Sequence, residues 1–391
     1  MGTEADITAT SEHNKRFPDP DRTRILNDNV TDWLRGTVKI PNDPENTPQP
    51  DTLSAYARFL RCLCAPNYTV FSNTESARHW NEDPERDSAK SRYVVPLESP
   101  HNAIHLALGG FYKEKVLNGS PIVGAFGDIA VDEMAGFDPI FFFHHCFIDY
   151  TFAEWQRLQN LTKRGDLTLI ETRDYPGTIL AKGQVPNFPP GTPLQMTTPL
   201  HPFKHSSGEY YTSEDATDLN ELGIVYGTGS LDAIIRDCDD LVRSGKSPFD
   251  IINRQISDPM TLAGSNPKDP NPFFLTKRVH NISLNQYAGS FVVRLYALGD
   301  DGEEVEVGRE PVLSRWDVAG CANCQNNLDV DLLVPMTAAA LDLLAGPTRK
   351  KKDIRWLVKI QTHDEWYEFD IGAPGEDRSG KPAGWPKVDD L

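Results

Sequence analysis

Hydrophobic positions recur at helical spacing in three stretches of the first half of the chain. Between Asp51 and Cys64 they fall three or four residues apart, after a Pro-Asp-Thr start that favours a helix N-terminus. Two further helices are predicted to begin at Ser99-Pro100 and at Asp138-Pro139, because each pair places a capping residue before a proline at the first helical position. The helix after Asp138 is so apolar that we expect it to be buried.

The second half of the chain has a different pattern, in which apolar and polar residues alternate in short segments between turn residues. Such alternation is typical of antiparallel strands. The predicted strands are Ser290–Tyr296, Glu304–Val307, Val330–Val334 and Arg355–Ile360. The change falls at residues 258–273, where four prolines stand among Asn, Asp, Gly and Ser. We therefore predict a mainly α domain over residues 1–257 with an irregular arm over 1–50, a linker over 258–273, and an antiparallel β domain over 274–391.

Charge and composition exclude several classes of partner. The 391 residues carry a formal net charge of −18, and a negative surface repels the phosphates of nucleic acids. No long apolar run suggests a membrane span, and the first residues lack the basic start and apolar stretch of a secretory signal. We therefore expect a cytoplasmic protein that acts on a small molecule, with no membrane or nucleic-acid partner. Six cysteines are too few for a disulfide-built scaffold, so reduced thiols are expected.

Three histidines are the strongest candidates for chemistry. His101 and His105 lie four residues apart in a predicted helix, so both project from one face and can reach one metal ion. His144 lies in the apolar helix after Asp138. Three neutral imidazoles with an open fourth position are typical of a catalytic zinc or copper site, in which solvent or substrate completes the shell.

Two motifs carry a resemblance to a known family. The sequence H-N-x-x-H at His101, followed by F-D-P-I-F-F-F-H-H-x-x-x-D from Phe137, resembles the second-copper half of the tyrosinase, catechol oxidase and hemocyanin superfamily. The resemblance implies metal ligands at His101, His105 and His144. It also implies a mainly α metal-binding core that is part of a four-helix bundle, with a C-terminal antiparallel β lid domain.

The same resemblance suggests roles for residues that follow the ligands. His145 and Asp149 look like residues that orient the ligands or tie their helix to its neighbours. Where the family often has an arginine after this aspartate, the chain has Tyr150, so the partner of Asp149 is left open.

Cys321 and Cys324 resemble a pair proposed to hand copper to the site in relatives, although a redox pair or no function are alternatives.

Glu98 and Asn102 are the candidate catalytic residues. Some fungal tyrosinases have a glutamate three residues before the first ligand, which restrains and deprotonates a water, and an asparagine after that ligand, which assists it. A carboxylate beside a metal-bound water can act as a general base. The alternative for Glu98 is an acidic residue in the first helical turn that stabilises the helix dipole.

The ligands of a first copper are not recognisable in the chain, because its other histidines show no helical ligand spacing. This favours a protein with one Zn²⁺ per chain, with Cu²⁺ as the alternative. The chain resembles the fungal cyclopenases, tyrosinase-like zinc lyases that contract a cyclopenin-type benzodiazepine-dione to a viridicatin-type 4-arylquinolinone. We expect that activity. The alternatives are a fragment of a polyphenol oxidase (tyrosinase or catechol oxidase) that lacks the first copper site, and a non-catalytic hemocyanin-like metal-binding protein.

The apolar helix after Asp138 also bears on assembly. In the family, the two ligand-bearing helices pack against two helices of the first-copper half. An exposed apolar face of that size marks an interface. We therefore expect a homodimer in which a second copy covers this face, since closed two-fold symmetry is the commonest arrangement of oligomers. The alternative cover is the arm over residues 1–50.

Overall fold

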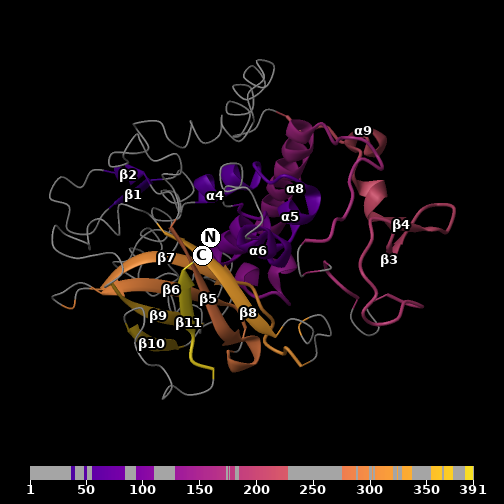
Figure 1. Ribbon diagram of the computed structural model, residues 1–391. Coiled ribbons are helices and arrows are strands. Elements are labelled where there is room, and N and C mark those ends of the chain that lie inside the picture. Colours follow the sequence, from indigo (N-terminus) through magenta and orange to yellow (C-terminus); the bar gives the residue numbers. More distant parts are fainter. Residues whose placement is uncertain are drawn as a thin grey trace, which may run out of the picture. The chain divides into compact units, whose positions relative to one another are not determined.

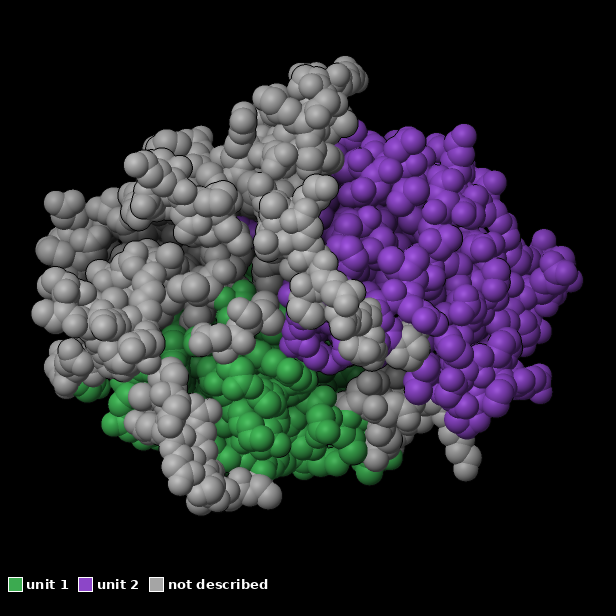
Figure 2. Space-filling view, in the orientation of Figure 1, with its two compact units in different colours: residues 1–58, 99–143, 258–391 green, residues 59–98, 144–257 purple. Residues whose placement is uncertain are grey.

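The computed structural model describes a large part of the chain. The described residues are 37–39, 48–50, 55–83, 94–109, 128–172, 175, 177–180, 185–227, 275–287, 289–298, 302, 304–319, 324, 328–336, 354–362, 365–372 and 384–390. The chain forms two compact units (Figure 2). Unit 1 comprises residues 1–58, 99–143 and 258–391, and unit 2 comprises residues 59–98 and 144–257. Among the described residues, no helix combines the length and apolar character that a membrane span requires.

Helices dominate the described part of the chain before residue 230, and strands dominate the part after it (Figure 1). The helices are α4 (Ala55–Cys62), α5 (Tyr68–Ser72), α6 (Thr74–Glu82), α7 (Glu98–Leu108), α8 (Ile140–Gln159) and α9 (Leu219–Leu222), with 3₁₀ turns η1 (Asp128–Ala130), η2 (Ala135–Phe137), η3 (Ser213–Ala216) and η4 (Leu284–Gln286). The strands are β1 (Thr37–Lys39), β2 (Pro48–Pro50), β3 (Pro199–Lys204), β4 (Tyr210–Thr212), β5 (Leu275–Ser283), β6 (Phe291–Leu298), β7 (Glu304–Val312), β8 (Asp329–Met336), β9 (Arg355–Gln361), β10 (Trp366–Gly372) and β11 (Lys387–Asp390).

Unit 1 is organised around two antiparallel sheets that share one hydrophobic core. The larger sheet has the strand order β10-β9-β6-β7 and the smaller one β11-β5-β8. Apolar residues from both sheets, including Val279, Phe291 and Val358, are buried in the same cluster. Seven of the eight residues of β6 are buried, and because successive side chains point to opposite faces, both faces of this strand are covered. Even Arg294 in this strand is buried, and its guanidinium pairs with Glu306 at 2.7 Å.

Helix α7 packs on this β structure. Leu106, near its C-terminal end, is buried together with Val292 of β6 and Ala130 of η1. Gly109, just after the helix, lies so close to Ala130 that a Cβ at this position would come within 2.1 Å of the alanine methyl group. The close approach of backbone segments therefore requires a glycine here.

Unit 2 contains α5, α6, α9 and most of α8, with an aromatic core. Trp155 of α8 is fully buried and stacks on Phe71 of α5 with ring centroids 4.6 Å apart. Its indole nitrogen donates to the Ala65 carbonyl at 2.9 Å, which satisfies the polar end of the side chain. The hairpin of β3 and β4 follows in the sequence.

Most predicted elements are confirmed, with boundaries shifted by a few residues. The helix expected over 51–64 appears as α4, and the helices expected after Ser99 and Asp138 appear as α7 and α8. All four predicted strands are present as β6 to β9, and β5, β10 and β11 were missed. The mainly α core with C-terminal antiparallel sheets is therefore confirmed. The arm over residues 1–50, apart from β1 and β2, and the linker over 258–273 lie outside the described residues.

The expectation that α8 is buried is wrong for its first turns. Phe142 and Phe143 are 65% and 73% exposed, whereas His144 is 7% exposed. A helix needs only one stripe of residues against a core, and the buried stripe of α8 runs through His144, Thr151 and Trp155.

A buried ion pair connects α4, α7 and β7. The Arg58 guanidinium donates to Glu310 Oε2 at 2.7 Å and to Ser99 Oγ at 2.6 Å, and Ser99 Oγ donates to Glu310 Oε1 at 2.6 Å. Both charged side chains are nearly inaccessible to solvent. Ser99 lies in the first turn of α7, so this network fixes the N-terminal end of the helix that carries His101 and His105.

Replacing Glu310 by glutamine should lower the free energy of unfolding by about 3 kcal/mol, because it leaves the Arg58 charge buried without its counter-charge. The midpoint of urea denaturation measures the loss. Glu304→Gln is the matched control on the same strand, since its pair with Lys359 is solvent-accessible and should contribute less than about 1 kcal/mol. Equal effects of the two substitutions would contradict the role assigned to the buried pair.

Candidate metal centre

The segment leading into α7 is held by hydrogen bonds before the helix begins. The Asn81 side chain both donates to the Val94 carbonyl (2.9 Å) and accepts from the Val94 amide (2.8 Å). The Leu97 amide then donates to the Phe71 carbonyl at 2.8 Å. These bonds hold the backbone of residues 94–97, immediately before α7.

His101 and His105 project from one face of α7, as their spacing predicts. The Nε2 atoms of the two rings lie 3.1 Å apart. His101 Nδ1 lies 2.8 Å from Asn102 Oδ1, and His105 Nδ1 lies 2.6 Å from the Ile129 carbonyl oxygen in η1. His105 is 2% exposed, so its ring orientation is set by the protein and not by solvent.

These contacts determine which ring nitrogen carries the proton. A carbonyl oxygen and an amide oxygen only accept hydrogen bonds, so the Nδ1 atoms of His101 and His105 donate to them. In the neutral rings both Nε2 atoms then carry lone pairs that face each other across 3.1 Å. Two such lone pairs repel each other unless a cation binds to both nitrogen atoms. The pair therefore fits a metal ion bound through both Nε2 atoms.

Helix α8 brings further imidazoles to the same place. His101, His105, His144 and His145 each offer a ring nitrogen, and these atoms lie within 4.8 Å of one another. His144 is buried, and the adjacent His145 is half-buried. The structure thus brings together all three predicted ligands, along with His145. Among the described residues this is the one group of three or more potential side-chain ligands so arranged.

Aromatic side chains of α8 flank the histidine cluster. The Phe141 ring packs edge-on against His105, with ring centroids 5.9 Å apart. Ile140 begins the helix, and its amide donates to Asp138 Oδ1 at 3.0 Å, so the predicted capping residue performs that role. The apolar Phe141 ring lowers the local dielectric constant around the His105 ring, which strengthens electrostatic interactions there.

Glu98 and Asn102 have structural contacts in addition to the predicted catalytic roles. Glu98 Oε2 accepts from the Thr74 amide at 2.7 Å and from its hydroxyl at 2.6 Å. Thr74 is the first residue of α6, so the carboxylate satisfies a free donor at that helix N-terminus and lies favourably in the helix dipole. Asn102 contacts the His101 ring through its amide oxygen, as described above.

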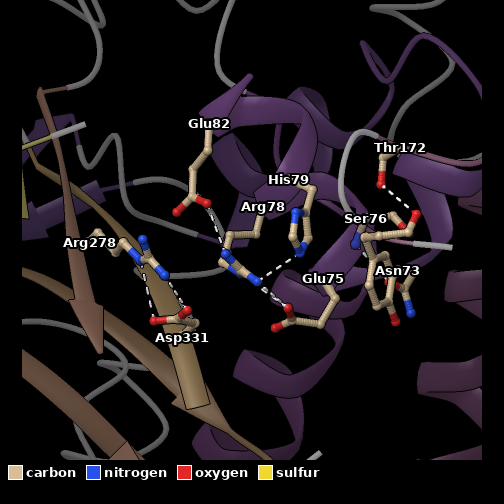
Figure 3. A network of polar contacts seen from close by, with 10 residues as sticks. Asn73, Glu75, Ser76, Arg78, His79, Glu82, Thr172, Arg278 and Asp331 are labelled. Carbon is tan, nitrogen blue, oxygen red and sulfur yellow. Dashed lines mark hydrogen bonds and ion pairs between the residues drawn. The ribbon is translucent and has the colours of Figure 1, made fainter. Parts of the chain in front are cut away.

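Helix α6, which Glu98 caps, is also stabilised along its length. Figure 3 shows Arg78 between Glu75 and Glu82, with ion pairs of 2.8 Å to each, one turn on either side. The guanidinium also contacts His79 Nε2 at 2.9 Å, and the His79 ring stacks on Tyr175. Burial, followed by the negative charges of Glu75 and Glu98, raises the pKa of Tyr175. The network keeps α6, and with it Thr74, in a defined position relative to Glu98.

The sequence does not identify a partner for Asp149. In the structure, its carboxylate accepts a hydrogen bond from the hydroxyl of Tyr226. The Tyr226 ring also packs edge-on against Tyr150, with centroids 5.5 Å apart. Burial and the hydrogen bond to Asp149 raise the pKa of Tyr226, so the phenol remains a donor at neutral pH. No feature of the sequence indicated this pair, because its members are separated by 77 positions.

Two further sequence expectations concern the cysteines. Cys62, Cys64 and Cys146 are free thiols, as expected. Cys324, in contrast, is disulfide-bonded, so the expectation of reduced thiols is wrong for this residue. A disulfide removes the thiolate that metal binding requires. Cys321 lies outside the described residues.

Comparison with known proteins agrees with this geometry. Residues 4–158 match the common central domain of tyrosinase. The chain is 38% identical to tyrosinase HcTyr2 of Hahella sp. over 355 residues, which cover 88% of this chain and 58% of that protein. It is 34% identical to a tyrosinase of Aspergillus oryzae over 351 residues, covering 85% and 58%. The chain thus spans less than three fifths of the length of these curated relatives.

A solved structure extends the similarity to the whole chain. The tyrosinase from Burkholderia thailandensis, in its structure at high pH, superimposes with a TM-score of 0.60 and 33% sequence identity. The match covers 100% of this chain and 68% of that one. Sequence identity and fold therefore agree over all of the present chain, and the histidine cluster lies on the helices that carried the family motifs. The chain belongs to the tyrosinase family.

Proposed function

We propose that this chain is a copper-dependent oxidoreductase of the tyrosinase type, which oxidises phenols or catechols, and that it holds one copper ion through His101, His105 and His144. The observation that supports this most directly is the pair of Nε2 atoms 3.1 Å apart with their Nδ1 atoms engaged elsewhere. Metal–nitrogen bonds of about 2.0–2.1 Å place two ligand atoms on one ion at such a separation.

The choice of copper over zinc rests on chemistry and on the relatives. Imidazole suits both ions, and at a given nitrogen site the affinity is higher for Cu²⁺ than for Zn²⁺. The relatives reported above are named tyrosinases. Bound copper would supply a redox centre that takes up one electron at a time. Oxidation of two catechols to two quinones releases four electrons and four protons, which reduce one O₂ to two water molecules. Nothing in the comparisons supports the zinc-dependent cyclopenase activity expected from the sequence. The proposed function is therefore the polyphenol oxidase alternative.

The residues of this chain would prepare the site before a substrate arrives. The Ile129 carbonyl and Asn102 hold both rings of α7 in the tautomer that presents Nε2. Neither contact requires the metal, so little rearrangement is needed when it binds. Phe141 packs against the His105 ring and excludes water from its edge. An aromatic substrate would find apolar surface beside the metal.

The test combines copper content and oxidation of catechol by the copper-loaded protein. We expect about one copper per chain and oxygen-dependent quinone formation in the wild type. His105→Ala and His144→Ala should each lose most of the copper and the activity, because three ligands are needed to hold the ion. His280→Ala is the matched control, since His280 pairs with Asp389 on β11 and belongs to no histidine cluster.

Three results would count against the proposal. Normal copper content in His105→Ala or His144→Ala would remove the assignment of the ligands. Stoichiometric copper without any quinone formation would reject the oxidoreductase and favour the hemocyanin-like metal-binding alternative. Stoichiometric zinc in protein purified without added metal would contradict the copper assignment and favour the zinc-dependent lyase.

A separate prediction concerns Glu98, for which we propose both a capping and a general-base role. Glu98→Gln should keep the copper, but should lower the free energy of unfolding by about 1 kcal/mol because Thr74 loses its charged acceptor. Turnover should fall, since the amide cannot accept a proton. Glu75→Gln, which removes an acid from the same region but not the cap, is the control. Turnover equal to that of the wild type would leave Glu98 with the cap alone.

We also retain the homodimer as a proposal. Phe137, Phe142 and Phe143 are 80%, 65% and 73% exposed and lie within seven residues of one another. Such a concentration of apolar surface marks an interface. Light scattering at low micromolar concentration should give twice the chain mass of 43.7 kDa. Replacing Phe142 and Phe143 together by serine should give monomers, and a monomeric, copper-loaded wild type would reject the dimer.

A further inference from the structure

The hydroxyl of Tyr226 lies against Asp149, one helical turn after His145 and five residues after His144. Helical geometry puts His145 and Asp149, four residues apart, on one face of α8. Among the described residues, Tyr226 supplies the hydrogen bond to this half-buried carboxylate. The contact therefore lies immediately beside the metal-binding part of the helix.

Tyr226 reaches this position through a segment that is attached to α8 at a second point. Gln156 Nε2 donates to the Thr217 carbonyl at 3.0 Å, and both residues are buried. Gln156 lies seven residues, or two turns, after Asp149 and hence on the same face. Between the two attachment points, the short helix α9 begins at the Asp218 cap and ends at Gly223, whose positive φ of 69° closes it. Residues 217–226 thus run along the face of α8 that carries His145 and Asp149.

We propose that Tyr226 is a positioning residue for the metal centre and that it acts through its hydrogen bond to Asp149. The Asp149 carboxylate lies one helical turn after His145, and a fixed donor gives it one orientation. The Tyr226 phenol supplies that donor without a second charge. Holding Asp149 also holds the turn of α8 that carries His144 and His145. The Tyr150 ring packs edge-on against the Tyr226 ring, which limits the movement of the phenol.

The experiment measures copper affinity, by competition with a chelator, and the copper EPR spectrum in the full-length protein. Tyr226→Phe removes one oxygen atom, and we expect copper affinity to fall about tenfold with altered hyperfine splitting. Asp149→Ala should have a similar effect, and the double variant should be no worse than either single one, because both act through one contact. Gln156→Leu is the matched control: it detaches the same segment at its other end and should lower stability but leave copper affinity and the spectrum unchanged.

This inference rests on the proposed copper site, and the two can fail separately. A wild-type protein that takes up no copper would reject the proposed function. If the wild type binds copper but Tyr226→Phe binds it equally tightly with the same spectrum, the positioning role is rejected and the copper site stands. Equal losses in Tyr226→Phe and Gln156→Leu, or additive losses in the double variant, would also overturn it, since the effect would then be general loosening of α8.

Discussion

The facing Nε2 atoms of His101 and His105 are the constraint on which the candidate metal centre depends. They lie 3.1 Å apart, and in the neutral rings, with both Nδ1 atoms donating hydrogen bonds, their lone pairs face each other. The protein holds this arrangement from three directions. Asn102 and the Ile129 carbonyl engage the outer ring nitrogens, and the Arg58–Glu310 pair holds the start of α7 through Ser99. The orientation of both rings is therefore fixed by contacts within the protein.

Helix α8 shows how one element serves several requirements. Its buried stripe anchors the helix through Trp155 and the aromatic residues of α5, while the same helix carries His144 beside the other ligands. Near the start of the helix, Phe142 and Phe143 are exposed, so these apolar side chains are not buried. Between these two regions of the helix, the Asp149 carboxylate accepts a hydrogen bond from Tyr226, which fixes its orientation.

Polar residues around the site perform structural and chemical tasks together. Glu98, the candidate general base, is also the cap of α6, and the ion pairs of Arg78 stabilise the helix that it caps. Asn102, the candidate assistant of that base, orients the first ligand. Such shared use lowers the entropy cost of binding, because a side chain already fixed by a structural hydrogen bond has little conformational freedom to lose when substrate or metal binds. It also means that stability and metal binding must be measured separately for each variant.

The sequence by itself determined the elements whose signals are local. The spacing of His101 and His105, the capping residue Asp138 before α8, and the alternation in β6 to β9 each act within a few residues, where helical and strand geometry follow directly from chain order. Ser99, which was predicted to cap α7, lies inside its first turn and contacts Arg58 and Glu310. Tertiary structure alone decided the contacts between distant segments. These include the Ile129 carbonyl that sets the His105 tautomer, the pairing of Arg58 with Glu310 across 252 positions, and the choice of Tyr226 as the donor to Asp149. Backbone carbonyls carry no side-chain signature, and a buried charge or phenol finds its partner only when folding excludes water from both.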